Sequence, residues 1–136
     1  MYQDIVYQVS DRIAVVTINR PKVLNAIRVQ TYKDIIAALQ SAEADRDVSV
    51  IVMTGAEGKF TAGNDLRDLL PEGDLEGVRD GVAGIFDTLA SMKKPLIMAQ
   101  EGVAVMRKQG LGGDIVNIAS KNGLVSGPNN VAYGTA

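Results

Sequence analysis

A chain of 136 residues with 46% hydrophobic side chains is long enough to bury one core, so a single domain is expected. Its 14 basic and 16 acidic side chains include no long basic run, which excludes the electrostatic footprint of a protein that binds nucleic acid or an anionic membrane surface. The chain has no His and no Cys, which excludes an imidazole base, a thiolate nucleophile, disulfides and almost every zinc site, and no metal is predicted.

The first elements expected are two strands and a helix. Residues 5–9 and 13–18 are β-branched runs separated by Ser10-Asp11-Arg12, which is the pattern of a hairpin. Apolar side chains then recur at spacings of three and four over residues 29–44, which predicts an amphipathic helix. The next apolar run, residues 48–54, is expected to be a buried strand.

A second helix and a further strand follow. Residues 75–92 keep helical spacing, Lys93 and Lys94 place cations at the end of that helix, and Pro95 stops it. Residues 96–99 predict a short strand. This ββα succession predicts an α/β fold, although periodicity alone equally allows a generic α/β sandwich.

Three sequence blocks stand in a fixed order: NRPKVLNA at residues 19–26, KFTAGNDL at 59–66 and KPLIMAQEGVAV at 94–105. The second block follows the strand expected at 48–54, where a turn of small residues leaves backbone N–H groups free to bind an oxyanion or a phosphate. Together the blocks resemble the crotonase family, also called enoyl-CoA hydratase/isomerase, over residues 1–105. The resemblance implies a ββα half-spiral in a single domain, to which residues 106–136 would append a strand and a loop.

The resemblance also implies where an acyl-CoA thioester would bind. The backbone N–H of Asn64 would be one donor of the oxyanion hole that holds the thioester carbonyl as it becomes an enolate. Five residues would line the groove for the pantetheine arm and adenine of coenzyme A, namely Leu24, Ala26, Ala62, Asp65 and Leu66. Two simpler interpretations stay open: Asp65 only caps the following helix, and Arg20 with Pro21 forms only a solvated surface turn.

The pattern changes after Val105. The family's second oxyanion donor is expected from a glycine run directly after Val105, yet Met106-Arg107-Lys108 stands there, and the family's catalytic carboxylates would lie beyond it. Losing one such donor typically costs about 2.7 to 4 kcal/mol of transition-state stabilisation. Residues 1–105 are therefore expected to bind an acyl-CoA while doing almost no chemistry, so the chain is expected to be inactive as an enzyme.

The remainder, residues 106–136, resembles a fragment of a short-chain dehydrogenase. It would supply a strand at 114–118 followed by Ser120 and Tyr133, but the Lys that this family places four residues after the Tyr is not in the chain. The glycines at 110–113 lack the spacing of a dinucleotide fingerprint. We therefore expect a chimera-like chain without redox chemistry, divided after residue 105.

A half-spiral would leave an apolar sheet edge and a helix face uncovered, and such surfaces pair with other chains. A homo-oligomer is expected, in which residues 106–136 or a second copy cover that edge. The alternative is a compact monomer in which a strand at 114–118 joins the sheet beside residues 96–99. The first residues lack the basic and apolar regions of a signal peptide, and no apolar run is long enough to span a bilayer, which predicts a cytoplasmic protein.

Three functions stay open. The first is a hydratase or isomerase of the crotonase type, the second a non-catalytic remnant that binds acyl-CoA, and the third a recombined or designed scaffold without ligand or activity. None requires a cofactor, because the coenzyme A thioester would be the substrate or ligand itself. Turnover of crotonyl-CoA separates the first function from the other two, and calorimetric titration with acetyl-CoA separates the second from the third.

Overall fold

The computed structural model of this protein describes residues 1–98. Its four strands form one sheet in the order β1-β2-β3-β4, with the bounds Ile5–Ser10, Ile13–Ile18, Val50–Gly55 and Leu96–Met98. β1 and β2 pair antiparallel, whereas β2 with β3 and β3 with β4 pair parallel. The strand predicted at 114–118 and the features expected at residues 110–113, Ser120 and Tyr133 lie outside the described residues.

All four strands predicted within residues 1–98 are present, and the differences are confined to strand ends. The hairpin turn consists of Asp11 and Arg12, whose φ angles of 50° and 66° are the positive values that a two-residue turn between twisted strands requires. The third strand begins at Val50 rather than Val48, because the Val48 N–H donates to the carbonyl of Asp45 in the preceding turn (3.2 Å). Val48 is nevertheless buried, so its apolar character indicates burial and not strand structure.

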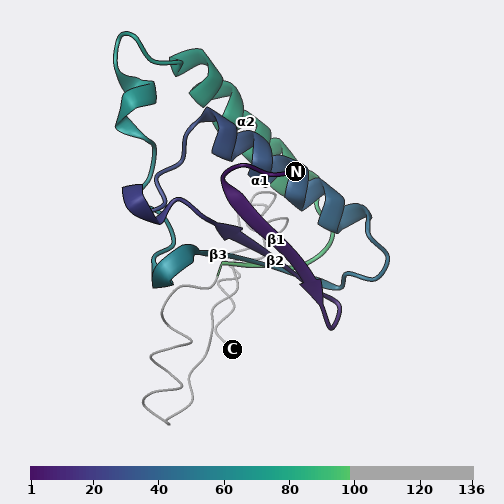
Figure 1. Ribbon diagram of the computed structural model, residues 1–136. Helices are drawn as coiled ribbons and strands as arrows, with labels where there is room; N and C mark the ends of the chain where they lie inside the picture. Colours follow the sequence, from purple (N-terminus) through teal and green to yellow (C-terminus); the bar gives the residue numbers. More distant parts are fainter. Residues whose placement is uncertain (99–136) are drawn as a thin grey trace, which may run out of the picture.

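Two long helices connect the parallel strands: α1 (Val29–Ala44) joins β2 to β3, and α2 (Leu75–Ser91) joins β3 to β4. Both predicted helices are thereby confirmed. Two crossovers of the same hand that advance in one direction across a sheet place their helices on the same face. Figure 1 shows this arrangement, with α1 and α2 side by side on one side of the sheet. Neither helix of the described part is long and apolar enough to cross a membrane.

The hydrophobic core lies between the sheet and α1. Alternate residues of β2 point into it, so Ala14 and Val16 are fully buried while Ile13, on the opposite face, is 39% exposed. The α1 residues that face the strands are all fully buried, namely Ile35, Ala38, Leu39 and Ala42. The period of two in the strands and the period of 3.6 in the helix therefore meet in one apolar layer.

Glycines allow α2 to approach α1 closely. A Cβ placed on Gly81 would lie 2.6 Å from Cγ of Tyr32, so only a residue without a side chain fits against this ring. One turn further, a Cβ on Gly84 would lie 2.9 Å from the flexible Cδ1 end of Ile36. The contact between the helices is therefore rigid at Tyr32 and adaptable at Ile36.

The end of α1 is tied to the start of β4. The carboxylate of Glu43 accepts hydrogen bonds from the backbone N–H groups of Lys93 (2.9 Å) and Lys94 (3.2 Å). Nζ of Lys94 donates to the carbonyls of Ala42 (2.7 Å) and Asp45. The sequence predicts Lys94 as a cation for the C-terminus of α2, whereas its ammonium group satisfies the unpaired carbonyls at the C-terminus of α1.

A buried carboxylate anchors the chain just before β1. Asp4 is 4% exposed and accepts hydrogen bonds from Nε and Nη2 of Arg28 (2.7 Å each) and from Oγ1 of Thr31 (2.6 Å). Nε of Arg20 lies 3.8 Å from the same carboxylate. Burial by itself raises the pKa of Asp4, but the hydrogen bonds from Arg28 and Thr31 and the two nearby cations outweigh it and hold this pKa below its usual value.

The glycine contacts generate a paired prediction for stability. Gly81→Ala should lower the free energy of unfolding by about 1–2 kcal/mol, because overpacking against Tyr32 exceeds the gain in helix propensity. Gly84→Ala, the matched control, should leave it unchanged or raise it by up to about 1 kcal/mol, because the end of Ile36 can move aside. Urea denaturation followed by circular dichroism measures both. Equal effects at the two positions would contradict the contact described at Tyr32.

The Asp4 cluster generates a prediction about acid. Because the pKa of Asp4 is lower in the folded state than in the unfolded chain, its contribution to stability is present above the unfolded value of about 3.9 and is lost as the pH falls through the folded value. Asp4→Asn should lower the free energy of unfolding by roughly 1–3 kcal/mol at neutral pH and flatten its decline below about pH 4. Denaturant melts across pH measure both effects. The exposed Asp87→Asn should retain the original decline, and an unchanged slope in Asp4→Asn would show that Asp4 is not the group responsible.

Candidate functional site

Two loops lie side by side at the edge of the sheet where β2 and β3 end. Neighbouring parallel strands end at the same edge, so the loop after β2 (residues 19–28) and the loop after β3 (residues 56–65) come together there. The N–H of Ala62 donates to the carbonyl of Leu24 (3.0 Å), and the N–H of Ile27 donates to the carbonyl of Gly63 (2.8 Å). These bonds make the two loops one structural unit.

The backbone N–H of Asn64 points away from this unit. Asn64 and Ile27 form an isolated parallel bridge, in which Ile27 bonds to the carbonyl of Gly63 and to the N–H of Asp65 (2.8 Å each). Because a trans peptide group is planar, the Asn64 N–H lies opposite the Gly63 carbonyl and is directed away from Ile27. Within residues 1–98 this N–H makes no hydrogen bond, and Asn64 is solvent-exposed. The predicted oxyanion donor is thus a main-chain N–H that has no partner within residues 1–98 and whose direction is fixed.

Asn25 holds the two loops at their base. It is fully buried with a φ of 56°, and its side chain accepts from the N–H of Arg20 (2.9 Å). Its Nδ2 donates to the carbonyls of Ala56 (2.9 Å) and Lys59 (2.6 Å) in the second loop. The sequence interpretation missed this residue, although Asn is one of the few residues that adopt positive φ readily and can bond the backbone on both sides.

Arg20 is also a structural residue of the site. Its side chain is only 10% exposed, and its guanidinium donates to the carbonyl of Ala26 (2.5 Å) and to Oδ2 of Asp65 (3.0 Å). The simpler interpretation of Arg20 as a solvated turn residue is therefore wrong. A buried guanidinium requires hydrogen-bond acceptors. The acidic residues elsewhere in the sequence were candidates for this role.

Asp65 joins the second loop to the short 3₁₀ helix η3 (Leu66–Leu69). Its carboxylate accepts from the N–H of Arg67 (3.2 Å), which is the capping role that the sequence left open. Nε and Nη2 of Arg67 also donate to it. The hydrogen bonds from Arg67, with burial acting against them and Arg20 adding to them, place the pKa of Asp65 well below its usual value. Asp65 is therefore ionised and already paired.

The side chains predicted to line the coenzyme A groove divide into two groups. Leu24 and Leu66 are 52% and 75% exposed, and Ala62 beside Leu24 is exposed as well. Ala26 and Asp65 are buried, and the carbonyl of Ala26 and the carboxylate of Asp65 both accept hydrogen bonds from Arg20. Leu24 has a φ of 53°, a left-handed conformation that leucine rarely adopts.

Tyr32 reaches the site from α1. The phenol donates to Oδ1 of Asn64 at 2.5 Å, and the ring is 7% exposed. Burial raises the pKa of Tyr32, so the phenol keeps its proton at neutral pH. The sequence predicted only an amphipathic helix over residues 29–44, because helical spacing indicates which face a ring occupies and not where its hydroxyl ends.

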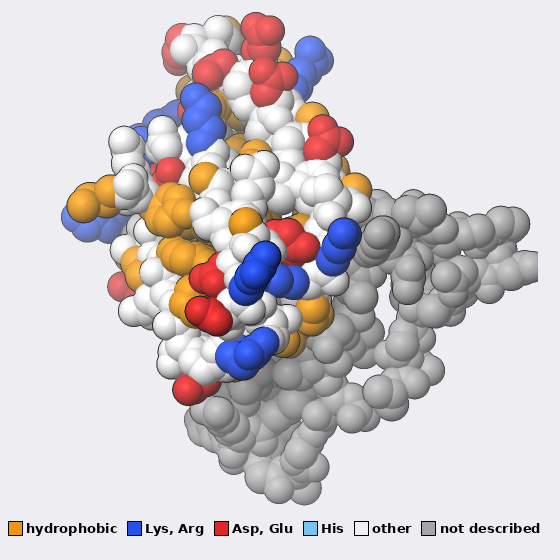
Figure 2. All heavy atoms as spheres, turned by 90° about the vertical axis from the view of Figure 1, so that its right-hand side faces the viewer, with side chains coloured by type: hydrophobic (Ala, Val, Ile, Leu, Met, Phe, Trp, Pro, Cys, Tyr) orange, Lys and Arg blue, Asp and Glu red, His pale blue; other side chains and the backbone are white. Residues whose placement is uncertain are grey.

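Basic and acidic side chains are mixed on the side of the molecule that Figure 2 shows. Figure 2 shows the side that carries the β1–β2 turn, where basic and acidic side chains are interspersed and no continuous patch of one sign forms. This pattern agrees with the net charge of −2. Within residues 1–98, no group of three acidic side chains is arranged to hold a metal ion.

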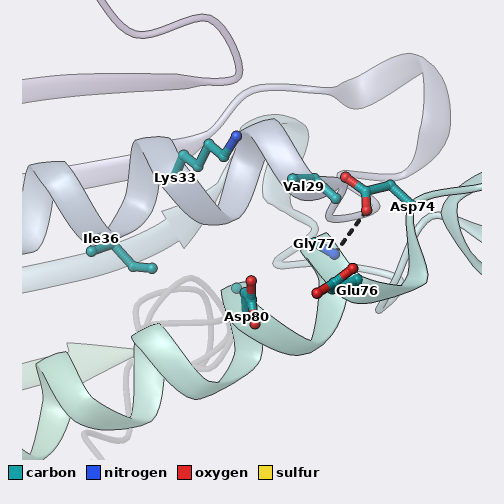
Figure 3. A pocket seen from close by; sticks show the side chains of 8 residues that line it. Val29, Lys33, Ile36, Asp74, Glu76, Gly77 and Asp80 are labelled. Carbon is teal, nitrogen blue, oxygen red and sulfur yellow. Dashed lines mark hydrogen bonds between the residues drawn. The ribbon is translucent and has the colours of Figure 1, made fainter.

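A groove of ≈ 400 Å³ lies between α1 and α2. Figure 3 shows its lining, which comprises Val29, Lys33, Ile36, Asp74, Glu76, Gly77, Asp80 and Gly81. None of the predicted site residues lines it. Three carboxylates against one ammonium group make it unsuited to the phosphates of coenzyme A. The candidate site is therefore the pair of loops and not this groove.

Sequence comparison identifies the family. The enoyl-CoA hydratase/isomerase family matches residues 8–120. A probable enoyl-CoA hydratase of Rhizobium meliloti is 32% identical over 104 residues, which cover 76% of this chain and 40% of the relative. The short-chain-enoyl-CoA hydratase of Clostridium acetobutylicum is 35% identical over 105 residues, with 75% and 40% covered. This chain therefore spans about 40% of the length of these curated relatives.

Solved structures agree with the sequence comparison. A putative enoyl-CoA hydratase/carnithine racemase from Magnetospirillum magneticum has a TM-score of 0.65 at 32% identity, with 75% of this chain and 40% of that chain covered. An enoyl-CoA hydratase/isomerase from Xanthobacter autotrophicus has a TM-score of 0.63 at 32% identity, with 74% and 39% covered. The predicted crotonase-like α/β half-spiral is thus confirmed. By fold and by sequence, the chain belongs to the enoyl-CoA hydratase/isomerase family.

Proposed function

We propose that the two loops bind the thioester of an acyl-CoA, with the backbone N–H of Asn64 donating to the thioester carbonyl. One observation carries this proposal: the Gly63–Asn64 peptide group is fixed by its bond to Ile27, and its N–H is directed outward. A donor held in this way costs no reorganisation when negative charge develops on a bound oxygen. Asn64 has a polar side chain where the family has a small apolar residue, but a main-chain donor tolerates that change.

The groove for the rest of coenzyme A would lie along the exposed part of the same loops. Leu24, Ala62 and Leu66 present apolar or small surfaces beside the amide, which suits a pantetheine arm that must approach the backbone closely. Ala26 and Asp65, the other two residues predicted to line this groove, are buried. The proposal is restricted to binding, because Met106-Arg107-Lys108 stands where the family's second donor is expected, and the family's catalytic carboxylates would lie beyond that point.

We also keep as proposals the division after residue 105 and a short-chain-dehydrogenase-like origin for residues 106–136. The family match, which continues to residue 120, supports a crotonase origin for the first part of that segment instead. Under the chimeric alternative the chain is a scaffold without activity. A cytoplasmic location is kept as a proposal.

A homo-oligomer is proposed because the sheet face opposite α1 and α2 is apolar. Val6 of β1 and Ile13 of β2 lie on that face and are each 39% exposed. A second copy covering this face would remove these side chains from water.

Binding of the thioester is tested by calorimetric titration of the 136-residue chain with acetyl-CoA and with S-ethyl-CoA, a thioether that lacks the carbonyl. The unaltered chain should bind acetyl-CoA about 2- to 10-fold more tightly, the preference that one hydrogen bond supplies. Asn64→Pro, which removes the N–H, should abolish the preference. Asn64→Ala, which retains the N–H, should keep it.

Three outcomes would contradict the proposed function. Equal affinity of the unaltered chain for the two ligands would exclude recognition of the carbonyl. Loss of the preference in both variants alike would assign the effect to the side chain and not to the backbone donor. No heat with either ligand would instead favour the scaffold without a ligand.

Oligomerisation is tested by light scattering over a range of concentrations. The unaltered chain should give a mass above that of one copy, and the double change Val6→Lys with Ile13→Lys should shift the mass toward one copy, because charges on the apolar face oppose its burial. Gln40→Lys, on the exposed side of α1, should leave the mass unchanged. A mass of one copy for the unaltered chain at every concentration would contradict the proposal.

A further inference from the structure

We infer that Tyr32 is a positioning residue for the Asn64 amide, because its hydroxyl keeps the side-chain oxygen of Asn64 from competing for backbone N–H groups of the site. The inference rests on the proposed function, since it concerns the donor on which that function depends. Tyr32 itself lies beneath the loop on α1 and would not contact the ligand.

The first step concerns the side chain of Asn64. Asn side chains readily bond nearby backbone N–H groups, in local turns that compete with other partners of those groups. An Asn at the position of a ligand-binding amide therefore brings its own acceptor next to the donor. A small apolar residue at this position would bring no such acceptor, so the Asn requires a device that occupies its oxygen.

The second step concerns how that oxygen is occupied. The hydroxyl of Tyr32 donates to Oδ1 of Asn64 at 2.5 Å. Tyr32 is 7% exposed, and its ring lies against Gly81 of α2, where a Cβ would lie 2.6 Å from Cγ of the ring. Because the ring belongs to α1 and packs against α2, the phenol has a fixed position and fixes the oxygen that accepts from it.

The third step concerns the backbone on either side of Asn64. Ile27 holds the carbonyl of Gly63 and the N–H of Asp65 at 2.8 Å each, and Arg20 holds the carboxylate of Asp65 at 3.0 Å. The main chain is therefore fixed independently of Tyr32. What Tyr32 adds is control of the side-chain oxygen of Asn64, an acceptor next to the N–H that makes no hydrogen bond within residues 1–98.

The test uses the preference of the full chain for acetyl-CoA over S-ethyl-CoA, measured by calorimetry. Tyr32→Phe keeps the ring but removes the hydroxyl, which releases Oδ1 of Asn64, and the preference should fall by about 2- to 10-fold while affinity for the thioether stays the same. The double variant Tyr32→Phe with Asn64→Ala lacks the released acceptor and should recover the preference. A merely structural role of Tyr32 does not give this rescue.

Three results overturn the inference. The first is an unchanged preference in Tyr32→Phe, and the second is a double variant as impaired as Tyr32→Phe alone. In both cases the proposed function still stands if Asn64→Pro abolishes the preference. The third is no preference in the unaltered chain, which removes the proposed function as well. Should Tyr32→Phe fail to fold, amide-resolved NMR of the unaltered chain decides: acetyl-CoA should shift the backbone N–H of Asn64 and not its side-chain NH₂ signals, and the reverse pattern refutes the inference.

Discussion

The site depends on one hydrogen bond, from the N–H of Ile27 to the carbonyl of Gly63. It joins the loops after β2 and β3, and through the planarity of the peptide group it also sets the direction of the Asn64 N–H. Residues that precede Ile27 in the first loop hold it in the position from which this bond forms. Asn25 fixes the base of the first loop, and Arg20 holds its end through the carbonyl of Ala26.

Buried polar groups support this arrangement. Asp4, Arg20, Asn25 and Asp65 are removed from water, and in the described part of the chain no buried side-chain nitrogen or oxygen lacks a hydrogen-bond partner. Such a network is costly when incomplete, since each unpaired group carries its full desolvation penalty. The loops are therefore held in one arrangement more strictly than apolar packing would hold them. The same pairing strongly lowers the pKa of Asp65.

Local periodicity predicted the elements of the fold well because it depends on which face of each element is buried. The helix over residues 29–44 and the strand over residues 13–18 agree with the observed bounds, and the misplaced start of β3 at Val48 shows that burial and strand structure are separate properties. The Asn64 loop was predicted from its motif. The roles of Arg20 and Tyr32 were not, because each depends on partners more than 30 residues away, and no local pattern encodes such a pairing.

The left-handed backbone at Leu24 has a consequence for the stability of this loop. For a residue with a Cβ, that conformation costs roughly 1–2 kcal/mol, and a glycine would relieve it. The exposed side chain repays little of this cost within the folded monomer. A ligand that covers this leucine would offset the cost, so the conformation at Leu24 links the stability of the loop to occupancy of the groove proposed above.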